Sequence, residues 1–192
     1  MEELEQIALL ISGDQKAYIW LVDTYGAKVK NMCYNYLQHE DDVQDAMQEV
    51  FIAIYTNIHK FDKKSSLSTW IYRITVNKCL EYIRYHTRKK RNGTTISIST
   101  TNYEWKENQI KSSYTANENI ENQEQKVILF KAIHQLPEQQ KTAFLLHKIE
   151  QQSYVEVAQI MQTTLSSVEA LLFRAKQNLK KILADYYKDY NS

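Results

Sequence analysis

Apolar residues recur every three or four positions through most of this chain. Between residues 41 and 59 this spacing places on one side Val43, Ala46, Met47, Val50, Phe51, Ile54 and Ile58. A stripe of this period predicts an amphipathic helix with one buried face. Similar stripes over 4–11, over 14–36 and from 70 into the basic run that ends at 91 predict a first helical domain, residues 1–91.

A second set of helical stripes follows further along the chain. These lie at about 127–133, 138–146, 154–161 and 165–187, and they predict a second helical domain, residues 123–192. Capping residues agree with these boundaries, because Asp14 and Thr164 are side chains that cap helix N-termini. Pro137 suits a first helical turn, where its missing N–H costs little.

Residues 92–122 break the pattern and predict a flexible linker. Ser, Thr, Asn and Glu dominate there, and the few apolar residues show no sustained period. Such a segment buries too little surface to offset its ordering entropy. The whole chain has only Gly 3 and Pro 1, which leaves few residues for hairpin turns. The expected fold is all-α, with two small helical domains joined by the linker and a helix-turn-helix in the second.

Charge and cysteine usage narrow the class of protein. The formal net charge is +1, so any affinity for nucleic acid depends on local basic residues, such as the run 84–91. Cys33 and Cys79 both lie within apolar helical patterns, which favours free thiols and a reducing cytosol over a disulfide framework. The acidic N-terminus and the absence of an apolar run of about 20 residues predict a soluble, cytoplasmic protein without direct membrane insertion.

The last two predicted helices have the pattern of a helix-turn-helix, whose second helix meets base edges in the major groove. The residues expected around the outer faces of that helix are Ser166, Ser167, Glu169, Ala170, Phe173, Arg174 and Lys176. Arg and Lys suit phosphate or guanine, and serines near a helix N-terminus suit phosphate. A plain helical bundle with a solvated polar face fits the same pattern, and the turn lacks the glycine often found there.

Aromatic and basic residues alternate at the end of the first domain. Trp70, Arg73, Tyr82 and Arg84 lie on one extended helix, a composition that suits unpaired bases stacked on rings and a backbone tracked by cations. Two other interpretations remain open. Trp70 fits an ordinary core position, and the run 84–91 fits a solvated helix end where cations meet the helix dipole.

Asp45, Gln48 and Glu49 come together at helical spacing beside the strong apolar stripe of 41–59. An acidic patch of this kind is either a solvated face or a surface for a partner. No His completes a metal-ligand spacing with Asp41, Asp42, Asp45 and Glu49, and the chain has no phosphate-binding loop, nucleophile elbow or dinucleotide turn. We therefore expect no enzyme activity, no metal and no cofactor.

Four motifs in this order resemble the extracytoplasmic-function class of bacterial RNA polymerase sigma factors. They are Asp45-Ala46-Met47-Gln48-Glu49-Val50-Phe51, Ser68-Thr69-Trp70-Ile71-Tyr72-Arg73-Ile74 followed by Asn77, Leu136-Pro137-Glu138-Gln139-Gln140, and Phe173-Arg174-Ala175-Lys176. The resemblance covers nearly the whole chain, with sigma region 2 in the first domain and region 4 in the second. It implies a factor that binds core RNA polymerase and directs promoter recognition.

The resemblance also implies roles for individual residues. The positions that match the polymerase-binding surface, on the clamp helices of the largest subunit, are Asp45, Gln48, Glu49 and Phe51. The positions that match recognition of the −10 promoter element are Phe61, Asp62, Ser68, Trp70, Arg73, Asn77, Arg84 and Arg88. The seven outer residues of the last helix, from Ser166 to Lys176, match the −35 recognition helix. The linker is expected in the RNA exit path, and the second domain on the flap of the second-largest subunit.

The resemblance further implies an anti-sigma factor as a partner, which in some cases holds its sigma factor at the membrane. Two positions depart from the family pattern, because Glu169 and Leu171 are often basic in relatives. A carboxylate repels phosphate but accepts a hydrogen bond from the cytosine amino group. A second possible class of protein is a stand-alone helix-turn-helix regulator, which would dimerise and bind a palindrome without polymerase.

Overall fold

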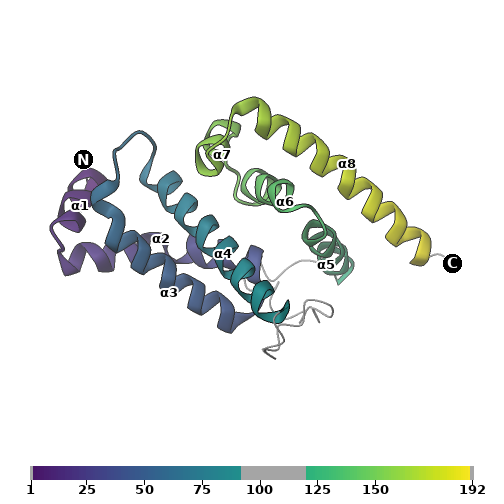
Figure 1. Cartoon of the computed structure of the whole chain (residues 1–192), viewed down its shortest axis with the longest axis horizontal. Helices are drawn as coiled ribbons and strands as arrows, with labels where there is room; N and C mark the ends of the chain where they lie inside the picture. The colour runs from purple at the N-terminus through teal and green to yellow at the C-terminus, as the bar shows by residue number, and fades with distance from the viewer. Residues whose placement is uncertain (1, 92–119, 191–192) are drawn as a thin grey trace. The chain divides into compact units, whose positions relative to one another are not determined.

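The computed structural model describes residues 2–91 and 120–190, which are helical throughout apart from short turns and loops (Figure 1). The chain divides into two compact units, one on each side of the segment 92–119. The expectation of two all-α domains is therefore confirmed. The predicted linker, 92–122, lies almost wholly outside the described residues, and the first helix of the second unit begins at Ile120.

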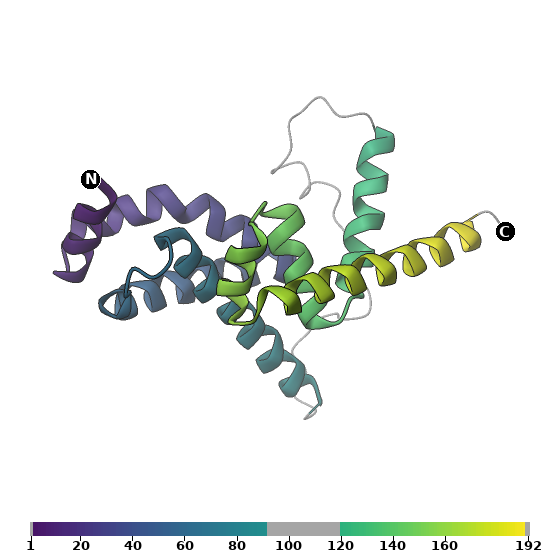
Figure 2. The same cartoon turned by 90° about the horizontal axis from the view of Figure 1, so that it is seen from above.

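The first unit is a helical bundle of three long helices with a short helix at its N-terminus. Its elements are α1 (Glu2–Ile11), α2 (Gln15–Leu37), α3 (Glu40–Asn57), the short 3-10 helix η1 (Ile58–Lys60) and α4 (Leu67–Arg91). Helices α2, α3 and α4 pack against one another, and α1 folds back against the start of α2 (Figure 2). The Tyr25 hydroxyl on α2 donates to the Glu3 carboxylate on α1 at 2.8 Å, which fixes this N-terminal helix.

The apolar stripe of residues 41–59 forms the centre of this bundle, as its spacing predicts. Val43, Val50 and Ile54 are fully buried, whereas Met47 is half-buried at the edge of the stripe. Cys33 on α2 and Cys79 on α4 are free and buried, and their sulfur atoms lie 3.7 Å apart. The two thiols therefore act as small core residues that join α2 to α4.

Local hydrogen bonds determine where the helices of the first unit begin. Asp14 caps α2, because its carboxylate accepts from the backbone N–H of Ala17 at 2.9 Å, as expected from the sequence. Gly13 precedes it with φ +81°, a left-handed conformation that favours glycine. At the start of α4, the Ser66 hydroxyl accepts from the Thr69 N–H at 3.1 Å.

A partly buried polar contact joins α3 to α4. The Tyr82 hydroxyl donates to the Asp42 carboxylate at 2.6 Å. Partial burial of the phenol, followed by this hydrogen bond and the nearby acidic charges, raises the pKa of Tyr82 above its ordinary value. The phenol therefore stays protonated as a donor, and it attaches the C-terminal half of α4 to the first turn of α3.

The second unit has the order of a helix-turn-helix domain. Its elements are α5 (Ile120–His134), α6 (Glu138–Phe144), the π-helical turn η3 (Leu145–Ile149), α7 (Tyr154–Met161) and α8 (Leu165–Tyr190). Pro137 lies at the N-cap of α6, one residue before the first turn where the sequence placed it. Ala143 on α6, Leu145 on η3, Val157 on α7 and Val168 on α8 are fully buried, so these four elements share one core.

Two caps and one left-handed residue shape the helix-turn-helix. Ser153 and Glu156 form a capping box at the start of α7, and Thr164 accepts from the Ser167 N–H at 3.2 Å at the start of α8. Between the helices, Gln162 takes φ 52° and ψ 47°. The turn thus uses the left-handed conformation that glycine adopts at lowest steric cost, but with a glutamine in that position.

This turn predicts a stabilising substitution. Gln162→Gly should raise the free energy of unfolding of the second unit by about 0.5 to 1 kcal/mol, because glycine removes the left-handed strain at some cost in chain entropy. Hydrogen exchange of the α7 and α8 amides in the full chain measures this change locally.

The matched control is Gln159→Gly, which places the same substitution inside α7 at an exposed position. It should destabilise the same amides by about 1 kcal/mol, since glycine in a helix interior lowers stability. Equal and unfavourable effects of the two substitutions would contradict a strained Gln162.

Candidate nucleic-acid and partner interfaces

The outer face of α3 carries the acidic motif and continues into apolar residues. Asp45, Gln48 and Glu49 are exposed, and one and two turns further along the same face lie Ile52, 53% exposed, and Tyr55, 50% exposed. We call these five residues the α3 outer face. Large apolar side chains exposed beside polar ones are typical of protein-binding surfaces.

Two features of α3 differ from what the sequence pattern suggested. Ile52 and Tyr55 were missed, although neither belongs to the apolar stripe of residues 41–59. An apolar residue on the polar side of an amphipathic helix is the signal that could have revealed them. Phe51, named for its match to the polymerase-binding motif, is only 6% exposed and packs in the core. Its part in partner binding stays a prediction, and in this structure its side chain supports the helix from within.

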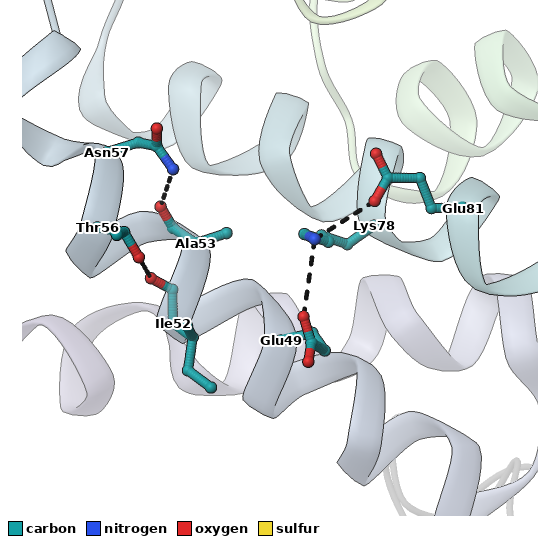
Figure 3. A network of polar contacts seen from close by, with 7 residues as sticks. All are labelled: Glu49, Ile52, Ala53, Thr56, Asn57, Lys78 and Glu81. Carbon is teal, nitrogen blue, oxygen red and sulfur yellow. Dashed lines mark hydrogen bonds and ion pairs between the residues drawn. The ribbon is translucent and has the colours of Figure 1, made fainter.

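A lysine from α4 reaches the α3 outer face. Lys78 Nζ lies 3.7 Å from a Glu49 carboxylate oxygen and 3.3 Å from a Glu81 carboxylate oxygen, so it bridges the two helices (Figure 3). Both carboxylates are largely exposed, and solvent screening keeps the stabilisation by such pairs small. The consequence is mainly geometric, because Lys78 orients the Glu49 carboxylate on the α3 outer face.

The loop before α4 is anchored by aromatic packing. The Phe61 and Trp70 rings lie 5.5 Å apart between centroids, and both side chains are buried. The structure thus favours the core interpretation of Trp70 that the sequence left open. Direct contact of either ring with DNA stays a prediction, and in this structure the two rings hold the loop against α4.

The tip of the same loop is polar and tightly turned. Asp62 is exposed and receives two contacts from Lys64, an ammonium 2.9 Å away and a backbone N–H 3.2 Å away. These hydrogen bonds hold the pKa of the Asp62 carboxyl below its ordinary value. Lys63 between them has φ 60°, so a non-glycine residue occupies the left-handed region at this tip. Ser68 follows, half-buried in the first turn of α4.

The solvent-facing side of α4 carries a basic strip. Arg73, Asn77, Arg84 and Arg88 are spaced four, seven and four residues apart, which keeps them on one helix face. We call these four residues the α4 strip. Arg73 is half-buried and the others are exposed, while Ile71, Thr75 and Cys79 are buried on the opposite side. One helix therefore joins the core of the unit to a polar, cationic surface.

One exposed aromatic ring, Tyr85, flanks this strip, while Tyr82 and His86 continue the side of α4 that carries Thr75 and Cys79. The His86 ring lies over Tyr82, with 4.2 Å between centroids, and its other neighbour is Tyr85 in an edge contact at 5.3 Å. Tyr85 is 48% exposed. The exposed Tyr85 ring beside the arginines therefore offers a stacking surface next to the cations that unpaired nucleotides require.

The first half of α8 presents the second candidate surface. Its outer residues Ser166, Glu169, Phe173, Arg174 and Lys176 are exposed, whereas Ser167 and Ala170 are half-buried. These seven residues form what we call the α8 recognition face. Val168, Leu172 and Ala175 are buried on the other side. The Thr164 hydroxyl lies 2.8 Å from the Ser167 hydroxyl and 3.2 Å from that of Ser166, so the serines cluster at the helix N-terminus.

Comparison with known proteins identifies the family. Residues 21–89 match Sigma-70 region 2, and residues 126–179 match Sigma-70, region 4. The ECF RNA polymerase sigma-E factor of Haemophilus influenzae is 32% identical over 168 residues, 88% of each chain. The sigma-E factor of Escherichia coli K12 is 32% identical over 165 residues, 86% of this chain and 85% of that protein. This chain belongs to the ECF family of RNA polymerase sigma factors.

Sigma factors of this family bind RNA polymerase and direct it to promoter DNA, so the chain is a transcription initiation factor and not an enzyme. The α4 strip lies within region 2, and the α8 recognition face lies within region 4. Across the residues with described positions, we find no group of three or more His, Cys, Asp or Glu arranged to hold a metal. None of the described helices is long and apolar enough to cross a membrane.

Solved structures share the fold of this sigma factor. Sigma factor RpoE from Bartonella quintana, in complex with the anti-sigma factor NepR, aligns with a TM-score of 0.68 and 16% identity over 88% of this chain and 98% of that one. CnrH, in complex with the cytosolic domain of CnrY, aligns with a TM-score of 0.65 and 20% identity over 94% and 96%. The two-domain helical architecture of this sigma factor is therefore shared with both.

The burial of Phe61 predicts how a substitution in the loop will act. Phe61→Ala should lower the free energy of unfolding of the first unit by about 3 kcal/mol, because it leaves a cavity against Trp70. Arg84→Ala, on the exposed strip, should change it by less than about 0.5 kcal/mol. Hydrogen exchange of the α3 and α4 amides distinguishes the two, and similar small effects would contradict a core role for Phe61.

Proposed function

We propose that this sigma factor binds core polymerase through the α3 outer face, reads the −10 element with the α4 strip and its preceding loop, and reads the −35 element with the α8 recognition face. The observation that carries the proposal is that the two sides of α4 have different roles, one in packing and one at the surface. Its apolar side is packed against α2 and α3, and its opposite side is lined with arginines. That arrangement presents cations at a fixed orientation to a phosphate backbone.

For the −10 element, the α4 strip and the loop before it supply two different kinds of contact. Arg84 and Arg88 attract the backbone, while Asn77 and the polar loop tip at Asp62 offer hydrogen-bonding groups to an unpaired base. Extruding a base costs a few kcal/mol of stacking energy. A loop that is already anchored by Phe61 and held in a left-handed turn at Lys63 loses little further entropy on binding, which favours capture.

For polymerase, the α3 outer face offers polar residues at one end and exposed apolar residues at the other. Glu49, oriented by Lys78, lies one turn before Ile52, so the face combines charge with an exposed apolar side chain. Its partner would be the clamp helices of the largest subunit. The second domain would bind the flap of the second-largest subunit, with residues 92–122 in the RNA exit path between the two contacts.

Affinity for promoters would then come from two weak contacts acting together. The chain as a whole has a net charge of only +1, so strong non-specific attraction to DNA is not expected from either unit. When polymerase holds both units at a set spacing, binding of one raises the effective concentration of the other. Dependence on polymerase keeps the free protein from occupying promoters unproductively.

Control by an anti-sigma factor is part of the proposal. RpoE of Bartonella quintana binds the anti-sigma factor NepR, and CnrH binds the cytosolic domain of CnrY. This chain shares the fold of both proteins, and its α3 outer face is an exposed surface that such a partner could cover. An anti-sigma factor anchored in the membrane would hold the sigma factor at the cytoplasmic side of that membrane. Its inactivation would release the sigma factor into the cytoplasm.

Reconstituted transcription tests the proposal as a whole. Core RNA polymerase, with and without this chain, is supplied with genomic fragments, and transcript start sites are mapped. The expected result is a limited set of new start sites with a shared motif near −10 and near −35. Start sites unchanged by the chain would contradict the proposal, and so would specific binding of the chain to a palindrome without polymerase.

Ile52 gives a sharper prediction for the polymerase contact. Ile52→Ala should weaken binding to core polymerase by about tenfold, because a central apolar side chain is lost from the interface. Fluorescence titration of the labelled full chain with core enzyme measures the dissociation constant.

Ile19→Ala is the matched control, since Ile19 is also 53% exposed but lies on α2. It should leave the dissociation constant within about twofold of the wild-type value, in line with the small effect of most surface substitutions. An equal loss for both variants, or no loss for Ile52→Ala, would remove Ile52 from the interface.

A further inference from the structure

We propose that Glu169 selects a cytosine within the −35 element and that Phe173 selects a thymine beside it. This inference rests on the proposed function, since it assigns base preferences to the α8 recognition face. Glu169 is the acidic residue of this face and Phe173 is its large exposed apolar residue, so neither attracts phosphate as the neighbouring Arg174 and Lys176 do.

The geometry places both side chains where bases are read. Glu169 and Phe173 are four residues apart on the first half of α8, and both are exposed, Phe173 at 63%. Each follows a buried residue, Val168 or Leu172, by one position, which turns it about 100° from that residue. The two side chains therefore lie on the same outer side of α8, away from its core. In a helix-turn-helix, the N-terminal part of the second helix contacts base edges.

The carboxylate of Glu169 is available for a ligand. Within the part of the chain that the structure describes, no ion pair or hydrogen bond engages it. It is also the one acidic residue of the sequence between 165 and 184, a segment that contains Arg174, Lys176, Lys180 and Lys181. The surrounding cations draw α8 toward DNA, and Glu169 alone opposes that attraction.

A carboxylate on this surface lowers the free energy of binding only where it meets a hydrogen-bond donor. In the major groove, guanine N7 and O6 and thymine O4 are acceptors, so all of them repel it. Adenine has an N6 donor but places the N7 acceptor beside it. Cytosine presents its N4 amino donor, which is the partner that Glu and Asp accept from. Glu169 therefore favours cytosine over the other three bases.

Phe173 extends the preference to a neighbouring base pair. Its four-residue separation from Glu169 corresponds to about 6 Å along the helix axis, or one to two base-pair steps of about 3.4 Å. An exposed phenyl ring in the major groove makes apolar contact with the thymine methyl group, and half-buried Ala170 lies between the two residues on the same face. The expected signature is a cytosine with a thymine one or two positions away.

The test uses core RNA polymerase with the full chain and a pool of promoter duplexes in which the −35 window is randomised. Bound duplexes are recovered and sequenced. With the wild-type chain, one position should be enriched in cytosine by about tenfold, the ratio that corresponds to about 1.4 kcal/mol for one base contact. Phe173→Ala should weaken the enrichment of thymine at the neighbouring position.

Two substitutions at position 169 make the outcome specific. Glu169→Gln should shift the enriched base from cytosine to adenine, because a glutamine amide pairs with adenine N6 and N7. Glu169→Ala should leave that position without a preference. Asp185→Asn is the matched control, since it neutralises another exposed carboxylate far from the N-terminus of α8, and it should leave every position unchanged.

The remaining outcomes would overturn the inference. If Glu169→Gln raises the affinity for all duplexes equally and leaves the base preferences unchanged, the carboxylate acts only by repelling phosphate. If wild-type complexes enrich a −35 sequence that neither substitution at 169 alters, the inference fails while the proposed function stands. If the wild-type chain with polymerase enriches no sequence, the proposed function itself fails.

Discussion

The structure depends on one constraint, which is that a long helix must bury a narrow apolar face while its opposite face stays in water. In the first domain that helix is α4, whose Ile71 and Cys79 pack against α2 and α3. In the second it is α8, held by Val168 and Leu172. Because side chains leave a helix at fixed angles, the buried face also determines where the α4 strip and the α8 recognition face point. In each domain, one side of the helix therefore packs in the core and the other side is positioned to bind DNA.

Short-range contacts refine this arrangement at the surfaces. The Phe61–Trp70 pair anchors the loop before α4, Lys78 orients Glu49, and Gln162 ends α7 in a left-handed conformation before α8 begins. None of these contacts contributes much stability by itself, apart from the aromatic pair. Their shared effect is to reduce the conformational freedom that binding would otherwise have to remove. Preorganisation matters most in a protein whose net charge gives little general affinity for DNA.

Much of the fold could be predicted from the sequence because the apolar period is regular. The stripe of 41–59, the caps at Asp14 and Thr164 and the helix 154–161 all lie where the pattern indicated. The sites were harder to predict, since exposure depends on tertiary packing that a local pattern does not contain. Ile52 lies off the apolar stripe, on the polar side of α3, where an apolar residue indicates a partner surface only once its exposure is known. Trp70 has the chemistry of a base-stacking residue yet is buried. The Glu49–Lys78 contact joins two helices, so no single segment reveals it.

The central claim is that each domain reads DNA weakly and that polymerase makes the two readings cooperate. The most direct measurement is the affinity of the purified full chain for a promoter duplex, determined at one salt concentration with and without core polymerase. The account predicts weak binding with little sequence preference for the chain alone, and tight binding in the presence of polymerase that is lost when either promoter element is scrambled. Equal affinity and equal specificity in the two conditions would contradict it.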